Sequence, residues 1–170
     1  MNALTPLDGR SLLTALLEAH VEFVVIGGLA LGAHGHVRGT KDVDIVPASD
    51  RDNLERLAAV LRSLEYEIIG TEEFEREELV HPDVEGLIAG GNWVLSTKYG
   101  RLDILQFVEP DLDYAKLAPE AVSDEVFGVH VRFCGYRHLV AMKERAGRPE
   151  DWIDLQRLRE IRGESEPESG

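Results

Sequence analysis

The chain has 170 residues, of which 44% are hydrophobic and 29% are charged, and it carries a net charge of −14 at pH 7. This length and apolar content suit one globular domain and exclude a chain that is disordered throughout. No run of residues approaches the roughly 20 consecutive apolar residues of a membrane span, and the N-terminus lacks the basic and apolar regions of a signal peptide. Cys134 is the single cysteine, so an intrachain disulfide is excluded. We therefore expect a cytoplasmic protein with no membrane partner.

The first expected element is an amphipathic helix between Pro6 and His20. Its leucines have helical spacing, at positions Leu12, Leu13, Leu16 and Leu17. The segment Phe23–Ile26 is continuously apolar, which predicts a strand buried on both faces. This strand ends at Gly27 and Gly28, where the missing Cβ atoms let a ligand such as a phosphate approach the backbone.

A second strand is predicted to begin at Asp42 and to carry two carboxylates on one face. Side chains alternate along a strand, so Asp42 and Asp44 share a face while Val43 and Ile45 point into the core. Neighbouring carboxylates repel each other unless a cation lies between them, and hard oxygen ligands suit Mg²⁺ or Mn²⁺ bridged to substrate phosphates. The pattern indicates metal-assisted phosphoryl or nucleotidyl transfer, with a glycine turn and surface aspartates as the alternative.

The spacing of these residues resembles a known signature. Gly27-Gly28, thirteen intervening residues and Asp42-x-Asp44 resemble the DNA polymerase β-like nucleotidyltransferase superfamily. A fuller pattern resembles the AbiEii-like nucleotidyltransferase toxins of type IV toxin–antitoxin systems and their small relatives, and it comprises Gly27, Gly28, His34, Gly35, Arg38, Thr40, Asp42 and Asp44. The resemblance implies an α/β fold with a nucleotidyltransferase core. We expect a mixed β-sheet of about four or five strands, flanked by helices on one side, and a C-terminal helical pair.

The middle of the chain carries the surplus of negative charge. Residues 42–130 hold 21 acidic and seven basic residues. A helix is predicted at the start of this region, because one apolar stripe contains Leu54, Leu57, Leu61 and Leu64. A short strand is predicted at residues 67–69. The acidic run at residues 72–78 is interpreted as a solvated loop or strand edge, or else as a surface for a cationic partner.

Two strand-like runs, Trp93–Thr97 and Arg101–Phe107, predict a β-hairpin. Asp103 lies between apolar residues of the second run, where burial of an unpaired charge would be unfavourable. The superfamily resemblance implies that a third metal-binding carboxylate lies on a strand beside the Asp-x-Asp strand, and Asp103 fits this place. The alternative is that Asp103 faces solvent opposite Arg101 or Lys98.

The C-terminal third predicts a second hairpin and two helices. The hairpin is expected around Gly128, outside the catalytic strands. Apolar residues with helical spacing predict a helix that ends at Gly147, and Pro149 suits the first position of the next helix. The composition of residues 163–170 predicts a disordered tail, so a single nucleotidyltransferase domain is expected over residues 1–162.

The segment 139–155 closely resembles the C-terminal helical signature of the AbiEii-like group. In this resemblance Lys143 matches the catalytic lysine and Arg148 an accompanying arginine, while Asp151 and Asp154 match acidic residues of the last helix. Lys143 falls beside the apolar stripe, so it can bury its stem and present its ammonium to a phosphate or a metal carboxylate. An ordinary solvated lysine is the alternative. For Asp151 the alternative is a first-turn carboxylate that complements the helix dipole.

The loop between the glycines and the Asp-x-Asp strand carries further candidate ligands. Arg38 can form a two-pronged contact with a phosphate, or else a salt bridge to the acidic middle segment. Thr40 can donate a hydrogen bond to a phosphate or cap the loop. His34 and His36 can contact a nucleotide, whereas a zinc site lacks a matching second pair of ligands.

The resemblance also implies a role for each candidate residue. Asp42 and Asp44 hold the Mg²⁺ or Mn²⁺ that orients a nucleoside triphosphate, and Asp103 completes a second metal site and helps to activate the acceptor hydroxyl. Lys143 neutralises charge on the transferring phosphoryl group. The expected nucleotide-binding residues are Gly27, Gly28, Arg38, Thr40, Arg148 and Asp154.

Three classes of acceptor or partner stay open. The first is a toxin-like enzyme that adds nucleotides to a tRNA or other RNA 3′ end, with a cognate antitoxin protein as a partner. The second is a small-molecule nucleotidyltransferase of the aminoglycoside or lincosamide type, and the third is a non-catalytic, antitoxin-like binding protein. We favour an RNA end, with Trp93 or Tyr99 stacking on a terminal base, because basic residues cluster in sequence at Arg132, Arg137, Lys143, Arg145 and Arg148.

Overall fold

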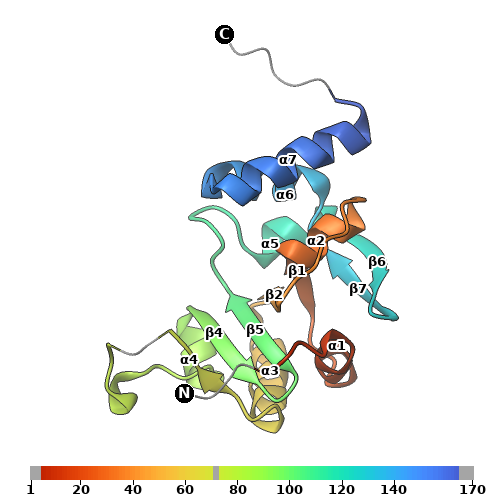
Figure 1. Ribbon diagram of the computed structural model, residues 1–170. Coiled ribbons are helices and arrows are strands. Elements are labelled where there is room, and N and C mark those ends of the chain that lie inside the picture. Colours follow the sequence, from red (N-terminus) through yellow and green to blue (C-terminus); the bar gives the residue numbers. More distant parts are fainter. Residues whose placement is uncertain (1–4, 71–72, 165–170) are drawn as a thin grey trace.

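Seven strands form one sheet within residues 5–70 and 73–164, which the computed structural model describes. They are β1 (Phe23–Ile26), β2 (Asp42–Pro47), β3 (Glu67–Ile68), β4 (Asn92–Thr97), β5 (Gly100–Leu105), β6 (Val122–Val126) and β7 (Val129–Phe133). Their order across the sheet is β3-β4-β5-β2-β1-β7-β6 (Figure 1). The expected number of four or five strands is therefore wrong, because the hairpin of β6 and β7 extends the same sheet through a parallel pairing of β7 with β1.

The sheet is mixed, as predicted, and its parallel pair β2–β5 lies near the centre. In this pair Asp44 lies directly opposite Asp103. The neighbours of the pair run antiparallel to it, since β1 pairs with β2 and β4 with β5 in that sense. The predicted hairpin around residues 98–99 is confirmed as the β4–β5 connection. Because β2 and β5 are distant in sequence, only the sheet brings their carboxylates together.

Helices cover both faces of the sheet. They are α1 (Gly9–Glu18), α2 (Gly28–Ala33), α3 (Arg51–Ser63), α4 (Val84–Ala89), α5 (Tyr114–Leu117), α6 (Tyr136–Ala146) and α7 (Pro149–Arg162), with 3₁₀ turns at Arg76–Glu78 and Ala118–Glu120. Figure 1 shows α1 and α3 on one side of the sheet and the pair α6–α7 on the other. The expectation of helices on one side only is thus wrong. All four residues of β1 are buried, which requires cover on each face.

The two predicted apolar stripes form the core beneath the sheet. In α1, Leu12, Leu13 and Leu16 are fully buried, and in α3 the stripe from Leu54 to Leu64 is buried as well. Val43 and Ile45 of β2 are also fully buried. Since side chains alternate along a strand, burial of Val43 and Ile45 on the α1–α3 side turns the intervening aspartate toward α6.

The described part of the acidic run and the end of α7 lie outside the strands of the sheet. Residues 73–75 and 77–78 of the acidic run are exposed, which agrees with a solvated loop. Helix α7 ends at Gly163 in a left-handed conformation, with φ at 69°. Most of the predicted disordered tail lies outside the described residues. Among the residues that are described, no helix is both long enough and apolar enough to cross a membrane.

Candidate active site

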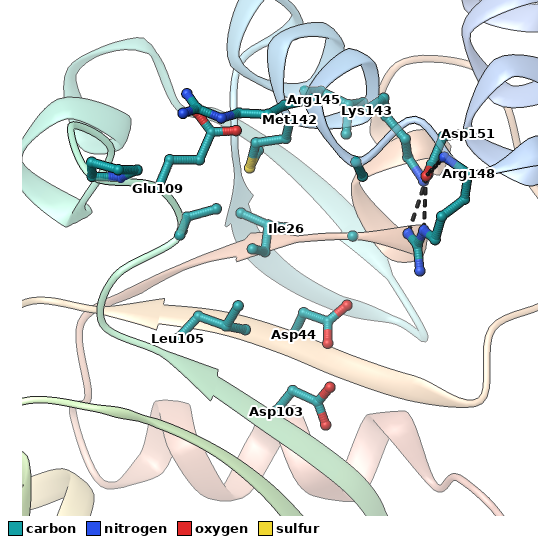
Figure 2. Close-up of a pocket in the computed structure, with 15 residues that line it drawn as sticks. Ile26, Asp44, Asp103, Leu105, Glu109, Met142, Lys143, Arg145, Arg148 and Asp151 are labelled. Carbon is teal, nitrogen blue, oxygen red and sulfur yellow. Dashed lines mark hydrogen bonds and ion pairs between the residues drawn. The ribbon is translucent and has the colours of Figure 1, made fainter.

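Three aspartates converge on the face of the β2–β5 pair that is turned toward α6. Asp42, Asp44 and Asp103 each offer a carboxylate oxygen, and these oxygens all lie within 4.8 Å of one another. Figure 2 shows Asp44 and Asp103 pointing from neighbouring strands into the same cavity. The strand period of two places Asp42 and Asp44 on one face, and the parallel register places Asp103 beside Asp44. The structure thus brings together the three carboxylates that the sequence singled out.

The electrostatics of this cluster fit a divalent cation. Burial, followed by the charges of Asp42 and Asp103, raises the pKa of Asp44 to about 8, although the charge of Arg101 acts in the opposite direction. A carboxyl group that is held protonated by burial and by neighbouring carboxylates is one that a bound cation would ionise. Three carboxylate oxygens at this separation are also the hard ligands that Mg²⁺ and Mn²⁺ accept.

Arg101 completes the cluster, and the sequence pointed to it only as an alternative partner for Asp103. Its Nε and Nη2 atoms donate to the two carboxylate oxygens of Asp103, each at 2.8 Å. Its Nε atom also lies 3.5 Å from Oδ2 of Asp42. The hydrogen bonds to Asp103 raise the pKa of Arg101 above its ordinary value. The contact between Arg101 and Asp103 could have been predicted from the sequence, because residues two apart on a strand share a face.

The glycine pair gives the carboxylates room. Gly27 has φ at 72°, and a Cβ atom there would lie 2.1 Å from Oδ2 of Asp44. A Cβ atom on Gly28 would lie 3.2 Å from Oγ1 of Thr40. The Thr40 hydroxyl donates to the backbone oxygen of Asp42 at 3.0 Å. Thr40 therefore caps the loop, which was one of the two alternatives for this residue. Gly27 must be a glycine because any side chain there would collide with the carboxylate of Asp44.

Lys143 is buried above the cluster and is held by α7. Its side chain is only 7% exposed, and its Nζ atom donates to Asp151 at 3.1 Å and to Asp154 at 2.9 Å. The alternative of a solvated helix lysine is therefore wrong. The carboxylates that hold its ammonium belong to the last helix, and Lys143 lines the same cavity as Asp44 and Asp103.

Asp151 combines a helix-capping contact with ion pairs. It accepts hydrogen bonds from the backbone N–H of Arg148 at 3.0 Å and from the guanidinium of Arg148 at 2.8 and 3.2 Å. Burial disfavours its charge, but the hydrogen bonds from Arg148 and Lys143 outweigh burial and lower the pKa of Asp151 to about 2. Asp151 is thus a carboxylate in the first turn of α7, as one alternative proposed, and it also forms a buried ion pair with Lys143.

Asp154 joins the loop before β2 to the C-terminal helices. Its Oδ2 atom accepts from Arg38 at 3.0 Å, and its Oδ1 atom lies 3.3 Å from Nε2 of His36. The salt bridge considered for Arg38 therefore exists, but its partner is in α7 and not in the acidic middle segment. His34 contacts the backbone oxygen of Cys134 at 2.8 Å. Within the described residues, neither histidine belongs to a cluster that could hold a metal ion.

A cavity of about 440 Å³ lies between the carboxylate cluster and α6. This volume suits a nucleotide-sized ligand. Its apolar lining includes Ile26, Leu105, Val108, Leu139 and Met142, and its charged lining includes Asp44, Asp103, Glu109, Lys143, Arg145, Arg148 and Asp151. Figure 2 shows Lys143, Arg148 and Asp151 across the cavity from Asp44. The cavity thus places positive groups opposite the carboxylates.

The basic residues near the C-terminus do not form one free patch. Arg137 pairs with Glu120, and Arg145 pairs with Glu109 at 3.2 Å. Arg132 donates to the backbone oxygen of Ala118 at 2.6 Å. Lys143 and Arg148 contact acidic residues of α7, so all five basic residues already bind other groups of the protein. The sequence-based argument for an RNA-binding patch is weakened accordingly.

The two aromatic side chains that were expected to stack on a terminal base, Trp93 and Tyr99, are both at least partly buried. Trp93 is only 7% exposed and donates from its indole to the backbone oxygen of Val80 at 2.8 Å. Its ring is therefore not open to a base, and this prediction is wrong. Tyr99 is half-buried, and the ammonium of Lys98 lies 5.3 Å from the centre of its ring.

The pKa of Asp44 predicts how stability depends on pH without metal. Because the folded protein holds this proton more tightly than the unfolded chain, the contribution of Asp44 to stability is greatest below about pH 4 and declines as pH rises to about 8. We expect the free energy of unfolding of the wild type, measured by urea denaturation with a chelator, to fall relative to that of Asp44→Asn across this range. A constant difference between the two proteins would show that Asp44 ionises normally.

Comparisons with known proteins bear on the fold. No protein-family model matches the chain, and no curated protein matches it. Solved structures do resemble it. The lincosamide antibiotic adenylyltransferase LnuA, bound to lincomycin, aligns with a TM-score of 0.63 and 14% identity over 92% of this chain and 99% of that chain. ANT(2'')-Ia in complex with adenylyl-2''-tobramycin aligns with a TM-score of 0.54 and 17% identity over 88% of this chain and 83% of that chain.

A third structure, an antigenic nucleotidyltransferase-like protein from Paracoccidioides brasiliensis, aligns with a TM-score of 0.54 and 14% identity over 92% of this chain and 78% of that chain. The chain therefore has the nucleotidyltransferase fold, a mixed sheet flanked by helices with a C-terminal helical pair. On that fold it carries a three-carboxylate cluster beside a glycine turn.

Proposed function

We propose that the protein is a metal-dependent nucleotidyltransferase, which moves a nucleoside monophosphate from a nucleoside triphosphate to an acceptor hydroxyl. The observation that carries this proposal is the convergence of Asp42, Asp44 and Asp103 within 4.8 Å of one another, beside Gly27, on a nucleotidyltransferase fold. These three residues would hold Mg²⁺ or Mn²⁺. The raised pKa of Asp44 supports the assignment, because a bound cation would favour the ionised form of this buried carboxyl group.

In the proposed mechanism, the protein positions the reacting groups and offsets negative charge. Asp42, Asp44 and Asp103 would hold a divalent cation, which would supply Lewis-acid polarisation of the phosphates. Asp103 accepts the proton of the acceptor hydroxyl as this oxygen attacks the α-phosphate. Lys143 faces the cluster across the cavity and offsets charge on the transferring group, with pyrophosphate as the leaving group.

The C-terminal helices and the loop before β2 would bind the nucleotide. Gly27, Gly28 and Thr40 lie beside the cluster, while Arg148 lines the cavity and its side chain is 61% exposed. The Oδ2 atom of Asp154 accepts from both Arg38 and Lys143, and its Oδ1 atom lies beside His36. We assign to Asp154 the positioning of Lys143 and Arg38, since a direct contact between its carboxylate and a phosphate would be repulsive.

For the acceptor we propose an RNA 3′ end, tRNA in particular. This choice rests on the resemblance of the two sequence blocks to the AbiEii-like toxins, which would also bring a cognate antitoxin as a partner and a cytoplasmic site of action. A small cationic molecule is the second candidate, and two observations favour it. The basic residues near the cavity are paired with acids, and two similar structures are of antibiotic-modifying enzymes, with lincomycin and adenylyl-2''-tobramycin named as their bound molecules.

The test is a transfer assay with Mg²⁺ and each labelled nucleoside triphosphate in turn. One arm contains total tRNA, and the other contains an aminoglycoside or a lincosamide. We expect label at the RNA 3′ end with the wild type and with the exposed-residue control Asp124→Ala, and no label with Asp44→Ala. Labelling of the small molecule alone would decide for the second candidate. Absence of transfer in both arms, with protein that is folded and metal-loaded, would contradict both acceptors.

A further inference from the structure

Arg101 places a positive charge inside the carboxylate cluster. Its fork donates to both oxygens of Asp103 at 2.8 Å, and its Nε atom lies 3.5 Å from Oδ2 of Asp42. Such two-pronged pairs are among the stronger charge-assisted contacts, and this one uses both acceptor atoms of Asp103. One positive charge of the protein itself therefore offsets the charge of Asp103 and part of that of Asp42.

A divalent cation would compete with this fork for Asp103. Both oxygens of Asp103 accept from the guanidinium, so a cation bound by all three aspartates would share one of these oxygens with it. The two positive groups would then repel each other at this short range. The backbone of Arg101 is fixed, because β5 pairs with β4 on one side and with β2 on the other. The side chain is 37% exposed, so it can turn toward solvent without disturbing the strand.

We propose that Arg101 is an internal counter-ion that a divalent cation must displace from Asp103, so that it stabilises the metal-free fold and weakens metal binding. This inference rests on the metal site of the proposed function. Arg101 acts here through the carboxylates, so it is a positioning residue. When metal binds, the cation therefore replaces the guanidinium at the cluster. The three carboxylates do not face one another without a positive charge at any stage.

The variant Arg101→Met tests the inference, because it removes the charge and keeps an unbranched side chain. Chelator-treated protein is titrated with Mn²⁺, and free Mn²⁺ is followed by its electron paramagnetic resonance signal. We expect Arg101→Met to bind Mn²⁺ at least about tenfold more tightly than the wild type, and to unfold at a lower temperature in chelator. Asp44→Asn in the same background should remove the tight binding, which would locate it at the cluster.

Two further variants sharpen the comparison. Arg51→Met removes an arginine that pairs with Glu55 at 3.0 Å on the exposed surface of α3, and it should change neither Mn²⁺ affinity nor metal-free stability appreciably. Arg101→Lys keeps the charge but not the fork, so its affinity should lie between those of the wild type and Arg101→Met. If Arg101→Met does not fold in chelator, the comparison of Arg101→Lys with the wild type decides.

The outcomes separate this inference from the proposed function. Equal or weaker Mn²⁺ binding by Arg101→Met, with clear binding by the wild type, overturns the inference and leaves the metal site standing. Failure of the wild type and of both Arg101 variants to bind Mn²⁺ overturns the inference and the proposed metal site together. Tighter binding by Arg101→Met that persists with Asp44→Asn also overturns it, because the ion would then lie elsewhere.

Discussion

The double variant Asp42→Ala, Asp44→Ala should lose nucleotidyl transfer by a factor of about 10³ or more. A metal ion that stabilises the transition state contributes several kcal/mol, and each 1.4 kcal/mol corresponds to about tenfold in rate. The variant should also lose the rise in thermal midpoint that Mg²⁺ or Mn²⁺ with a nucleoside triphosphate gives the wild type. Transfer of label and thermal denaturation measure the two effects.

This double variant is expected to fold. Burial and the charges of Asp42 and Asp103 disfavour ionisation of Asp44, so removal of this carboxyl group does not cost the metal-free protein a favourable charge. Its thermal midpoint in chelator should therefore be no lower than that of the wild type. Asp124→Ala, at an exposed position of β6, controls for loss of an aspartate as such. Should the double variant keep the full metal-dependent shift, the metal would bind at another site.

Lys143→Met should lower both turnover and stability. The buried ammonium donates to Asp151 and Asp154, and removal of one partner from a buried ion pair typically costs about 3–5 kcal/mol. We expect the lower end, about 3 kcal/mol, because Arg148 still pairs with Asp151 and Arg38 with Asp154. Turnover should fall at least about a hundredfold, as expected for a group that offsets transition-state charge. Urea denaturation and steady-state kinetics give the two values.

Two matched variants interpret this result. Lys116→Met, at an exposed position of α5, should change the free energy of unfolding by no more than about 0.5 kcal/mol. Lys143→Met combined with Asp154→Asn should recover part of the lost stability, since Asp154 is a buried carboxylate that has lost one of its cationic partners, but should recover no activity. Wild-type turnover in a folded Lys143→Met protein would show that Lys143 is not a catalytic residue.

Local patterns in the sequence were sufficient for most elements and for the carboxylates. The apolar run of β1, the alternation in β2 and the leucine stripes of α1 and α3 each follow from short-range periodicity, and the structure has these elements at those places. The pairing of Asp103 with Asp44 needed the family resemblance, because no local pattern specifies which strands become neighbours. The number of strands was missed for the same reason, since β7 joins the sheet through a distant partner, β1.

The charged contacts could not be predicted, because sequence proximity does not indicate pairing in space. Arg137 and Arg145 form part of a basic segment, yet their partners Glu120 and Glu109 come from earlier segments. Asp154 likewise meets Arg38 across more than a hundred residues of chain. The fork between Arg101 and Asp103 is the exception, since residues two apart on a strand share a face and this contact was open to prediction.

The parallel register of β2 and β5 has a consequence for recognising such sites in other sequences. The segment between the two strands contains α3, β3, an acidic loop, α4 and β4, and the loops that join these elements can gain or lose residues without moving the pair. Inside β5, however, a shift of a single residue would turn Asp103 to the opposite face of the sheet. A search pattern for this site should therefore leave the distance between Asp44 and Asp103 free and constrain only the alternation of apolar residues around each aspartate.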